Sequence, residues 1–304
     1  SGGDVVHEAR RRGLHSHLLR VACCRVAEGP DLIRLAVFGQ PVAHSLSPRI
    51  HAQFARQCGL AIDYRAIEAT ADTFSEQVRE LAGQGGRGCN VTVPFKHAAW
   101  RLARRRSERS DLAEAANTLR FDTDGWFADN TDGGGLLFDL ETGAGRSLEG
   151  ARICLLGAGG AAAGVTAALL QARPSLLLIA NRSASRAAAL AERHARLGAV
   201  RGAGLDAIEA LGPFDLVVNA TSAGHDGGAP GIRASWLQAD GLCYDMNYSN
   251  AAEPLRAACE RTGLDYRDGL GMLVGQAALS FRMWTGKRPD TAAVLDRLRH
   301  SAGK

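Results

Sequence analysis

A glycine-rich turn at residues 157–162, Gly-Ala-Gly-Gly-Ala-Ala, has the spacing of a phosphate-binding loop. In a G-x-G-x-x-A pattern the first glycine makes a tight turn and the second lets the backbone approach a pyrophosphate. The N–H groups at the start of the following helix then face the phosphates. Glycine and alanine runs also occur for packing alone, so the prediction depends on the apolar strand before the turn and the helix after it. The pattern predicts that a dinucleotide is bound by Gly157, Ala158, Gly159, Gly160 and Ala161, with Ala162 as the small packing residue.

The loop after the next predicted strand, residues 181–186, indicates which dinucleotide is bound. Sites for NAD usually place Asp or Glu there, because a carboxylate accepts hydrogen bonds from the ribose 2′-OH. This loop has no acid and has two arginines four residues apart. Guanidinium groups bind phosphate through paired hydrogen bonds. The loop predicts NADP(H), bound by Asn181, Arg182, Ser183 and Arg186, although ordinary surface arginines near a helix start would give the same pattern.

Lys96 is unusual in this composition, because only three of the 36 basic residues are lysines. The other two are Lys287, in a predicted turn, and Lys304, the last residue. An ammonium group can give up its proton near neutral pH, whereas a guanidinium group cannot. Lys96 also belongs to one of three polar clusters at predicted strand ends or loops, which are residues 44–48, 90–96 and 129–133. We expect the substrate chemistry in these clusters.

The clusters lie in a first unit in which short apolar stretches alternate with helix-length segments. The predicted strands are residues 32–38, 64–67 and 88–93, followed by a hairpin of residues 117–121 and 125–128. One helix begins with Ser47 as N-cap before Pro48 and stops at Gly59. Further helical segments are predicted at residues 74–81 and, after the break at Pro94, to about residue 116.

A second unit follows Gly150 and repeats the alternation of strands and helices. Its predicted strands are residues 152–156, 175–180, 214–219 and 241–245, and its helices are residues 161–171, 185–196 and 254–262. Two final helices, at residues 271–284 and 292–300, have no strand to pair with in this unit. We therefore expect them to pack against the first unit.

This alternation predicts an α/β protein of two domains. One is an α/β substrate-binding domain, and the other is a Rossmann-type dinucleotide-binding domain with a doubly wound parallel sheet. The predicted boundaries are an N-terminal extension at residues 1–30, a substrate-binding catalytic domain at residues 31–132 plus 270–304, and an NADP-binding domain at residues 133–269. The active site is expected in a cleft between the domains, at the carboxyl ends of the strands.

Charge and cysteine content argue against several other classes of protein. The net charge is only +4, and the densest basic stretch, residues 101–109, is diluted by Glu108 and Asp111, so nucleic-acid binding is not expected. The seven cysteines form no CxxC or metal-ligand pattern, which predicts reduced thiols, no bound metal and a cytoplasmic location. Residues 153–170 carry no charge, but their glycines and alanines favour a strand, turn and helix over a membrane span. Arg20 and Arg25 interrupt the only apolar stretch near the N-terminus, so no signal peptide is expected.

Taken in order, the motifs of the chain resemble those of the shikimate dehydrogenases from about residue 32 onward. The matching landmarks are HSLSP (44–48), NVTVPFK (90–96), AANTL (115–119), DNTDG (129–133), GAGGA (157–161), NRSxxR (181–186), NATSAG (219–224), YDMNY (244–248) and DGLGMLVGQA (268–277). The resemblance implies NADPH-dependent, reversible reduction of 3-dehydroshikimate to shikimate. This reaction belongs to chorismate and aromatic amino acid biosynthesis.

By motif position, the resemblance implies that Lys96 and Asp132 form the catalytic pair. Hydride transfer to a ketone carbon leaves an alkoxide that must gain a proton. An ammonium beside the carbonyl oxygen stabilises this charge and supplies the proton. Asp132 would keep the amine charged and oriented. Which of the two formally takes the proton in the reverse direction is left open.

The same carry-over implies the residues that bind the substrate and the nicotinamide. Ser45 and Ser47 would bind the substrate carboxylate with help from Tyr248, and the ring hydroxyls would be bound by Asn90, Thr92, Asn117 and Gln276. A small polyol acid needs many such neutral partners, because an analogue lacking a hydroxyl leaves them unpaired. The implied cofactor contacts on the nicotinamide side are Thr221, Ser222, Met246 and Gly269.

Two residues depart from the pattern of the resembled family. Ser183 stands where the family often has Thr, a change that keeps a hydroxyl group. Asn247 stands where the family often has an apolar or aromatic residue. The effect of Asn247 on the pocket does not follow from the sequence.

Three alternatives remain beside the implied activity. A broader quinate/shikimate dehydrogenase usually accepts NAD and places an acid near the adenosine ribose, which residues 180–186 lack. A non-catalytic sensor of the same ligand would not need the Lys96 and Asp132 pair. A purely structural Rossmann protein is the third alternative. The expected partner is a small-molecule substrate, with no nucleic acid and no membrane, and the chain is expected to be a monomer or a homodimer.

Overall fold

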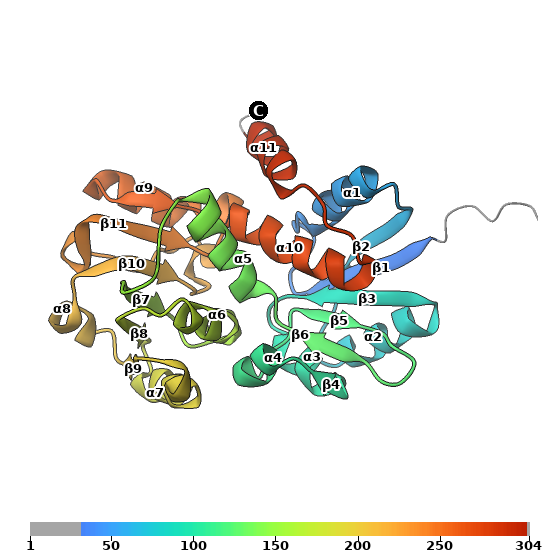
Figure 1. Ribbon diagram of the computed structural model, residues 1–304, viewed down its shortest axis with the longest axis horizontal. Helices are drawn as coiled ribbons and strands as arrows, with labels where there is room; N and C mark the ends of the chain where they lie inside the picture. Colours follow the sequence, from blue (N-terminus) through green and yellow to red (C-terminus); the bar gives the residue numbers. More distant parts are fainter. Residues whose placement is uncertain (1–31, 303–304) are drawn as a thin grey trace, which may run out of the picture. The chain divides into compact units, whose positions relative to one another are not determined.

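The computed structural model of this chain describes residues 32–302, with side chains through residue 300. The extension predicted at residues 1–30 lies outside this range. Within the described residues the strands form two six-stranded sheets (Figure 1). Helices and strands alternate along the chain, so the predicted α/β class is confirmed.

The first sheet is mixed, with strand order β2-β1-β3-β5-β6-β4. Its strands are β1 (Ile33–Gly39), β2 (Ile62–Glu68), β3 (Gly86–Val91), β4 (Arg105–Arg106), β5 (Thr118–Arg120) and β6 (Phe127–Asp129). β1 pairs in parallel with β2 and β3, whereas β5 is antiparallel to β3 and β6. The β5–β6 hairpin was predicted, but β4 was not, because its two exposed arginines carry no strand pattern.

The second sheet is entirely parallel within the described residues, with strand order β12-β11-β10-β7-β8-β9. Its strands are β7 (Arg152–Leu156), β8 (Leu176–Ala180), β9 (Val200–Ala203), β10 (Phe214–Asn219), β11 (Leu237–Asp245) and β12 (Asp265–Arg267). The chain winds outward from β7 in one direction to β9 and then from β10 in the other. This confirms the doubly wound Rossmann-type sheet, whose ligand crevice lies where the winding reverses.

The helices lie between the strands along the chain, except for the last two, which follow the last strand. They are α1 (Ser47–Cys58), α2 (Phe74–Gly83), α3 (Lys96–Leu102), α4 (Glu108–Ala113), α5 (Asp132–Phe138), α6 (Gly160–Gln171), α7 (Ala184–His194), α8 (Ala207–Leu211), α9 (Glu253–Thr262), α10 (Leu270–Thr285) and α11 (Thr291–Ala302). Short helical turns are η1 (Asp139–Gly143, a π-helix), η2 (Ala195–Leu197), η3 (Ala223–Asp226), η4 (Ala234–Trp236) and η5 (Ser249–Ala251).

Helix α1 corrects one detail of the sequence analysis. The N-cap is Leu46, and Ser47 is already helical, so Ser47 does not cap the helix as expected. Pro48 stands in the first turn, and Gly59 ends the helix in the left-handed conformation (φ 65°), as predicted. The hydroxyl group of Ser47 is consequently not used for capping and remains available for another role.

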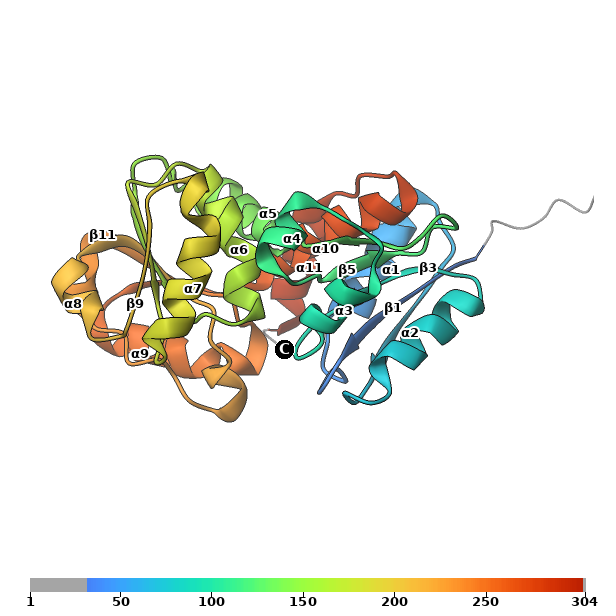
Figure 2. The same ribbon diagram turned by 90° about the horizontal axis from the view of Figure 1, so that it is seen from below.

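Helix α5 was not predicted, because its three consecutive glycines have poor helix propensity. The structure shows what these glycines permit. A Cβ at Gly133 would lie 2.6 Å from the Cβ of Ala168 in α6, and one at Gly135 would lie 2.5 Å from the Met272 carbonyl oxygen in α10. Close packing on both neighbours therefore outweighs propensity, and Figures 1 and 2 show α5 running alongside α10.

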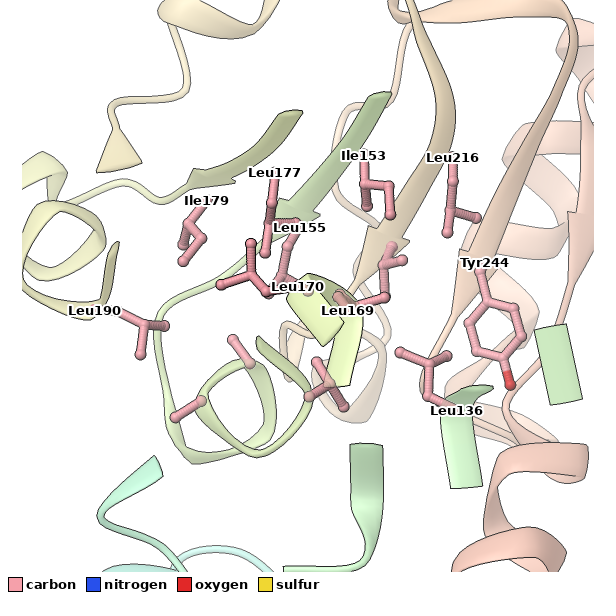
Figure 3. Close-up of a cluster of buried hydrophobic side chains, with 14 of the residues drawn as sticks. Leu136, Ile153, Leu155, Leu169, Leu170, Leu177, Ile179, Leu190, Leu216 and Tyr244 are labelled. Atoms are coloured by element: carbon pink, nitrogen blue, oxygen red, sulfur yellow. The ribbon is translucent and has the colours of Figure 1, made fainter. Parts of the chain in front are cut away.

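The apolar core extends from the second sheet through α6 to α5. Figure 3 shows these side chains, which include Leu155 of β7, Leu169 of α6 and Leu136 of α5, all fully buried. On the other sheet, Phe281 of α10 packs on Phe54 of α1, as expected for the C-terminal helices. The domain boundaries themselves remain a prediction. No helix in the described part of the chain is long and apolar enough to cross a membrane.

Candidate active site

Lys96 and Asp132 form a close ion pair. Lys96 begins α3 and Asp132 begins α5, and the Lys96 Nζ atom lies 2.5 Å from Asp132 Oδ2. The side chains are only 12% and 8% exposed. The two residues implied as the catalytic pair are 36 positions apart in the sequence, and the structure brings them together.

Asn117 fixes the orientation of this carboxylate. Its Nδ2 atom donates to Asp132 Oδ1 at 2.8 Å, so each carboxylate oxygen has a different partner. The same amide group donates to Thr131 Oγ1 and to Gln276 Oε1 at 2.9 and 3.1 Å. The Thr131 backbone N–H in turn donates to Asn117 Oδ1 at 2.8 Å. Asn117 therefore links the ion pair to Gln276 of α10.

Asn90 belongs to a second hydrogen-bond network, beside the one formed by Asn117. Its Nδ2 atom donates to Thr118 Oγ1 and to Ser280 Oγ at 3.1 and 3.0 Å, and its Oδ1 atom accepts from the Tyr64 hydroxyl at 2.7 Å. The Thr118 hydroxyl also donates to Asn117 Oδ1 at 2.9 Å. This hydrogen bond joins the network of Asn90 to that of Asn117. With its amide N–H groups engaged, Asn90 has acceptor capacity left at Oδ1 for a hydroxyl group of a ligand.

The ion pair lies directly against the helix that follows the glycine turn. A Cβ built on Gly164 of α6 would lie 3.0 Å from Asp132 Oδ2, and one on Gly160 would lie 3.8 Å from the Lys96 Cβ atom. A larger residue at position 164 would displace the carboxylate. The absence of a side chain there allows the first turns of α6 and the Lys96–Asp132 pair to share one site.

The residues implied for carboxylate binding lie around Tyr64. The Ser47 backbone N–H donates to Ser45 Oγ at 3.3 Å, which places the two hydroxyl-bearing residues together. Burial raises the pKa of Tyr64 well above its usual value, Cys89 and Tyr248 act in the same direction, and a hydrogen bond with Ser47 opposes them. The Tyr64 hydroxyl group is therefore within hydrogen-bonding reach of Ser47.

Thr92 is the predicted substrate residue with the least support from the contacts. Thr92 follows β3, and its side chain packs against Gly39. A Cβ atom built on Gly39 would lie 2.4 Å from the Thr92 Cγ2 atom. Within residues 32–300, no side-chain hydrogen bond joins Thr92 to Asn90, Asn117 or Gln276.

The glycine turn fits a pyrophosphate. Gly157 has a φ of 110°, a conformation that favours glycine. Gly159 is the N-cap of α6, and a Cβ there would meet nothing within 4 Å, so the space above it is open. Ala162 is fully buried, as the small third residue of the pattern requires. The residues present thus fit the phosphates of a dinucleotide, with Ala158, Gly160 and Ala161 supplying the rest of the loop.

The loop after β8 presents two arginines to solvent. Arg182 and Arg186 are exposed, and neither makes a hydrogen bond or ion pair with any residue in the described part of the chain. Asn181 Nδ2 donates to the Ser183 carbonyl oxygen at 3.1 Å, which shapes the loop. The Ser183 hydroxyl lies 3.0 Å from that of Ser185. Free guanidinium groups at this strand end fit a 2′-phosphate.

The residues implied on the nicotinamide side follow β10, β11 and β12. Thr221 is held by Asn219, whose Oδ1 atom accepts from the Thr221 backbone N–H and hydroxyl groups at 3.0 and 2.7 Å. Ser222 is exposed beside it. Gly269 lies so close to Met246 that a Cβ would stand 2.4 Å from the Met246 carbonyl oxygen.

Sequence reasoning missed four polar residues of this site: Tyr64, Thr118, Thr131 and Ser280. Thr118 and Thr131 stand within the AANTL and DNTDG landmarks, so their motifs carried a signal. Ser280 lies one helical turn after Gln276, and its hydroxyl donates to the Gln276 carbonyl oxygen at 3.2 Å. Tyr64 had no signal beyond its place in a strand.

Metal binding and thiol chemistry have no support in the described residues. No group of three or more His, Cys, Asp or Glu side chains there could hold a metal ion. Cys89, next to Asn90, is fully buried, and burial raises the pKa of its thiol. Its thiol is therefore protonated at neutral pH.

Comparisons with known families match three stretches of the chain. Residues 37–119 match the family described as shikimate dehydrogenase substrate binding domain. Residues 140–226 match shikimate / quinate 5-dehydrogenase, and residues 269–299 match shikimate 5′-dehydrogenase C-terminal domain.

Individual relatives match over nearly their whole length. The shikimate dehydrogenase (NADP⁺) of Chromohalobacter salexigens is 52% identical over 270 residues, covering 88% of this chain and 97% of that protein. A crystal structure of shikimate 5-dehydrogenase from Thermus thermophilus in complex with NADP(H) and shikimate is similar with a TM-score of 0.76 and 32% identity, covering 88% of this chain and 99% of that one. A crystal structure of an Ael1 enzyme from Pseudomonas putida is similar with a TM-score of 0.79 and 43% identity, covering 88% and 98%. The chain therefore belongs to the shikimate dehydrogenase (NADP⁺) family of oxidoreductases.

Proposed function

We propose that this chain catalyses the reversible, NADPH-dependent reduction of 3-dehydroshikimate to shikimate, a step of chorismate and aromatic amino acid biosynthesis. The observation that carries the proposal is the Lys96–Asp132 ion pair lying against Gly160 and Gly164 of α6. A proton donor and the start of the dinucleotide-binding helix thus share one site. The names of the relatives and the shikimate complex of the Thermus enzyme support the choice of substrate.

Lys96 acts as the general acid in the reduction. NADPH, when bound, supplies the hydride for the ketone carbon. The Lys96 ammonium group donates a hydrogen bond to the ketone oxygen, stabilises the negative charge that develops there and transfers a proton to it. In the oxidative direction the neutral amine accepts that proton back.

Asp132 holds the ammonium group in place through Oδ2, while Asn117 holds Oδ1. The carboxylate is therefore oriented before any ligand arrives. Partial burial strengthens its attraction to Lys96, since few water molecules screen the pair. Asp132 also shares the substrate hydroxyl group with Lys96 in this proposal.

The remaining polar residues bind the substrate. Ser45, Ser47 and Tyr248 take the carboxylate, and Tyr64 joins them through its hydroxyl group near Ser47. The ring hydroxyls are bound by Asn90, Thr92, Asn117 and Gln276. A substrate with fewer hydroxyl groups would leave buried amides unpaired, which disfavours its binding.

NADP(H) is bound by the turn at residues 157–161 and by the loop at residues 181–186. Arg182 and Arg186 bind the 2′-phosphate, because they are exposed, unpaired in the described part of the chain and next to the carboxyl end of β8. Thr221, Ser222, Met246 and Gly269 lie on the nicotinamide side.

A second candidate is a dehydrogenase that also accepts quinate, since residues 140–226 match a family described as shikimate / quinate 5-dehydrogenase. The absence of an acid in residues 181–186 favours NADP(H) and hence the first candidate. A monomer or homodimer in the cytoplasm remains the expectation from the sequence.

The deciding experiment is a spectrophotometric assay of the purified protein. Shikimate and quinate are each offered with NADP⁺ and with NAD⁺, and the reduced cofactor is followed by absorbance. We expect the highest kcat/KM for shikimate with NADP⁺. Absence of turnover with shikimate would overturn the proposal, and a higher kcat/KM for quinate would favour the second candidate.

A further inference from the structure

Asp245 is a buried carboxylate without a cationic partner among the described residues. It ends β11 and has no exposed surface. Its Oδ1 atom accepts hydrogen bonds from Asn219 Nδ2 at 2.9 Å, from the Asn247 backbone N–H at 3.0 Å and from Asn247 Nδ2 at 2.9 Å. Burial raises the pKa of Asp245 to about 6, and these hydrogen bonds oppose the rise. Hydrogen bonds from the two asparagines therefore stabilise this carboxylate in place of a cationic side chain.

Both asparagines also hold Thr221. Asn219 Oδ1 accepts from the Thr221 backbone N–H and hydroxyl groups, and Asn247 Nδ2 donates to the Thr221 carbonyl oxygen at 3.2 Å. Thr221 is thus fixed at its backbone on both sides and at its side chain. Asp245 does not hydrogen-bond Thr221 in this arrangement but joins the two residues that do.

The same three residues connect the segments that follow β11 and β12. The Met246 backbone N–H donates to the Asn219 carbonyl oxygen at 2.9 Å, and the Gly269 N–H donates to the Asn247 carbonyl oxygen at 2.8 Å. Gly269 has no room for a side chain, since a Cβ would lie 2.4 Å from the Met246 carbonyl oxygen. Asn219, Asp245 and Asn247, which we call the polar brace, therefore connect three neighbouring strand ends.

The polar brace lies next to the glycine turn. A Cβ at Gly157 would be 3.2 Å from the Ala220 carbonyl oxygen and 3.5 Å from Thr221 Cγ2. In the strand order β12-β11-β10-β7-β8-β9, the turn after β7 separates Arg182, after β8, from the brace, after β10 and β11. A dinucleotide whose pyrophosphate lies on the turn has its 2′-phosphate end at Arg182. Its other end must then lie over β10 and β11.

We propose that the polar brace positions Thr221, Met246 and Gly269 as the wall that receives the nicotinamide end of the cofactor. Its three members are positioning residues, because they act through the residues that they hold. This inference rests on the proposed NADP(H) binding. A fully satisfied buried network is rigid, and removing one member leaves others without partners.

The test compares two ligands that share the adenosine end. NADPH has the nicotinamide, whereas 2′-phospho-ADP-ribose lacks it, and both carry the 2′-phosphate. In Asn247→Leu, which keeps the size of the side chain but removes its amide, we expect the Kd of NADPH to rise about 5- to 30-fold. The Kd of 2′-phospho-ADP-ribose should stay within about twofold, since its contacts at the turn and at Arg182 are untouched.

Two controls make the result specific. Asn250→Leu changes an exposed asparagine three residues away and should alter neither Kd. Arg182→Ala should weaken both ligands alike, because it acts at the shared end. If Asn247→Leu does not fold, Asn247→Ala is measured in the same way.

Equal weakening of both ligands by Asn247→Leu would overturn the inference, because it would indicate a general loss of structure. An unchanged Kd for NADPH would overturn it as well. Failure of the parent protein to bind NADPH at all would instead overturn the proposed function on which the inference rests.

Discussion

Asp139 and Asp132 are both buried carboxylates with a cation beside them, but the two cations hold them differently. Arg267 binds both oxygens of Asp139, with Nε at 2.9 Å from Oδ2 and Nη2 at 2.5 Å from Oδ1. The Tyr244 hydroxyl donates to Asp139 Oδ2 as well, at 2.8 Å. Lys96 makes a single contact with Asp132, and the amide of Asn117 takes the other oxygen.

Under the proposed function, this difference separates a carboxylate that stabilises the fold from one that takes part in proton transfer. A guanidinium group saturates a carboxylate through two parallel hydrogen bonds and does not release a proton near neutral pH. Asp139 therefore ties η1 to β11 and β12. Asp129 is held in the same way by Arg109, whose Nε and Nη2 atoms reach both oxygens. Only three of the 36 basic residues of the chain are lysines, and the proposed function assigns the transferable proton to the lysine at position 96.

Lys96→Arg tests this comparison most directly. Arginine keeps the positive charge and can still pair with Asp132, but it cannot transfer a proton. We expect kcat for shikimate oxidation to fall by about 10²- to 10⁴-fold, the usual contribution of general acid–base catalysis. Steady-state kinetics measure the loss, and Lys287→Arg, at a lysine outside the site, serves as the matched control. A kcat within about tenfold of the parent value would remove the role proposed for Lys96.

Arg267→Met tests the structural member of the comparison. The substitution leaves Asp139 buried without its cation, which costs about 3–5 kcal/mol of unfolding free energy when one partner of a buried pair is removed. Denaturant-induced unfolding measures this value. Lys96→Met should cost less, because the Asp132 side chain that it leaves unpaired is 8% exposed, against 1% for Asp139. Equal losses in the two variants would contradict the distinction between the pairs.

Arg182→Ala extends the comparison to an arginine that has no partner in the described residues. Because no carboxylate saturates it, its guanidinium group is free to bind a 2′-phosphate. We expect the Kd of NADPH to rise about 10- to 100-fold, a range typical of hydrogen bonds to a charged group. The Kd of NADH should change little. The experiment titrates both cofactors by fluorescence, and equal effects on the two would contradict selection through the 2′-phosphate.

Much of this arrangement could be predicted from the sequence, because it depends on local patterns. The glycine turn, the strand before it and the loop with Arg182 follow one another within a single strand–helix–strand unit. Their geometry is set by hydrogen bonding inside that unit. The pairing of Lys96 with Asp132 was anticipated only from the family resemblance, since nothing local brings α3 and α5 together.

What the sequence did not predict depends on packing between distant elements. Helix α5 has glycines that disfavour a helix in isolation, and it forms because they fit closely against α6 and α10. The short strands β4, β9 and β12 are defined by their neighbours, and their own residues carry little strand pattern. Tyr64 and Ser280 join the site through the register of β2 and the helical phase of α10, which no nearby motif signals.

Tyr64→Phe examines one of these missed residues. The loss of its hydroxyl group leaves Asn90 Oδ1 without its 2.7 Å donor and removes a polar group near Ser47. We expect KM for shikimate to rise about 3- to 10-fold with a smaller change in kcat, as for one neutral hydrogen bond. Tyr244→Phe, at a tyrosine whose hydroxyl group donates to Asp139, should leave KM for shikimate unchanged. A fall in kcat with constant KM would argue against a role in substrate binding.

His51→Phe gives the smallest expected effect, which appears only as a pH dependence. His51 is fully buried, stacks on Tyr64 with ring centroids 4.3 Å apart, and makes no hydrogen bond of good geometry within residues 32–300. Burial lowers its pKa from 6.5 to about 3, while Asn90 acts in the opposite direction. Between these values the unfolded chain binds a proton that the folded protein does not, so stability falls as the pH drops below 6.5. Denaturant unfolding at about pH 7 and about pH 5 gives the decrease in unfolding free energy on acidification. We expect this decrease to be smaller in His51→Phe than in the parent protein. In His300→Phe, a substitution on the surface, it should equal that of the parent. An equal decrease in unfolding free energy in all three proteins would show that burial of His51 does not contribute to the acid sensitivity of the fold.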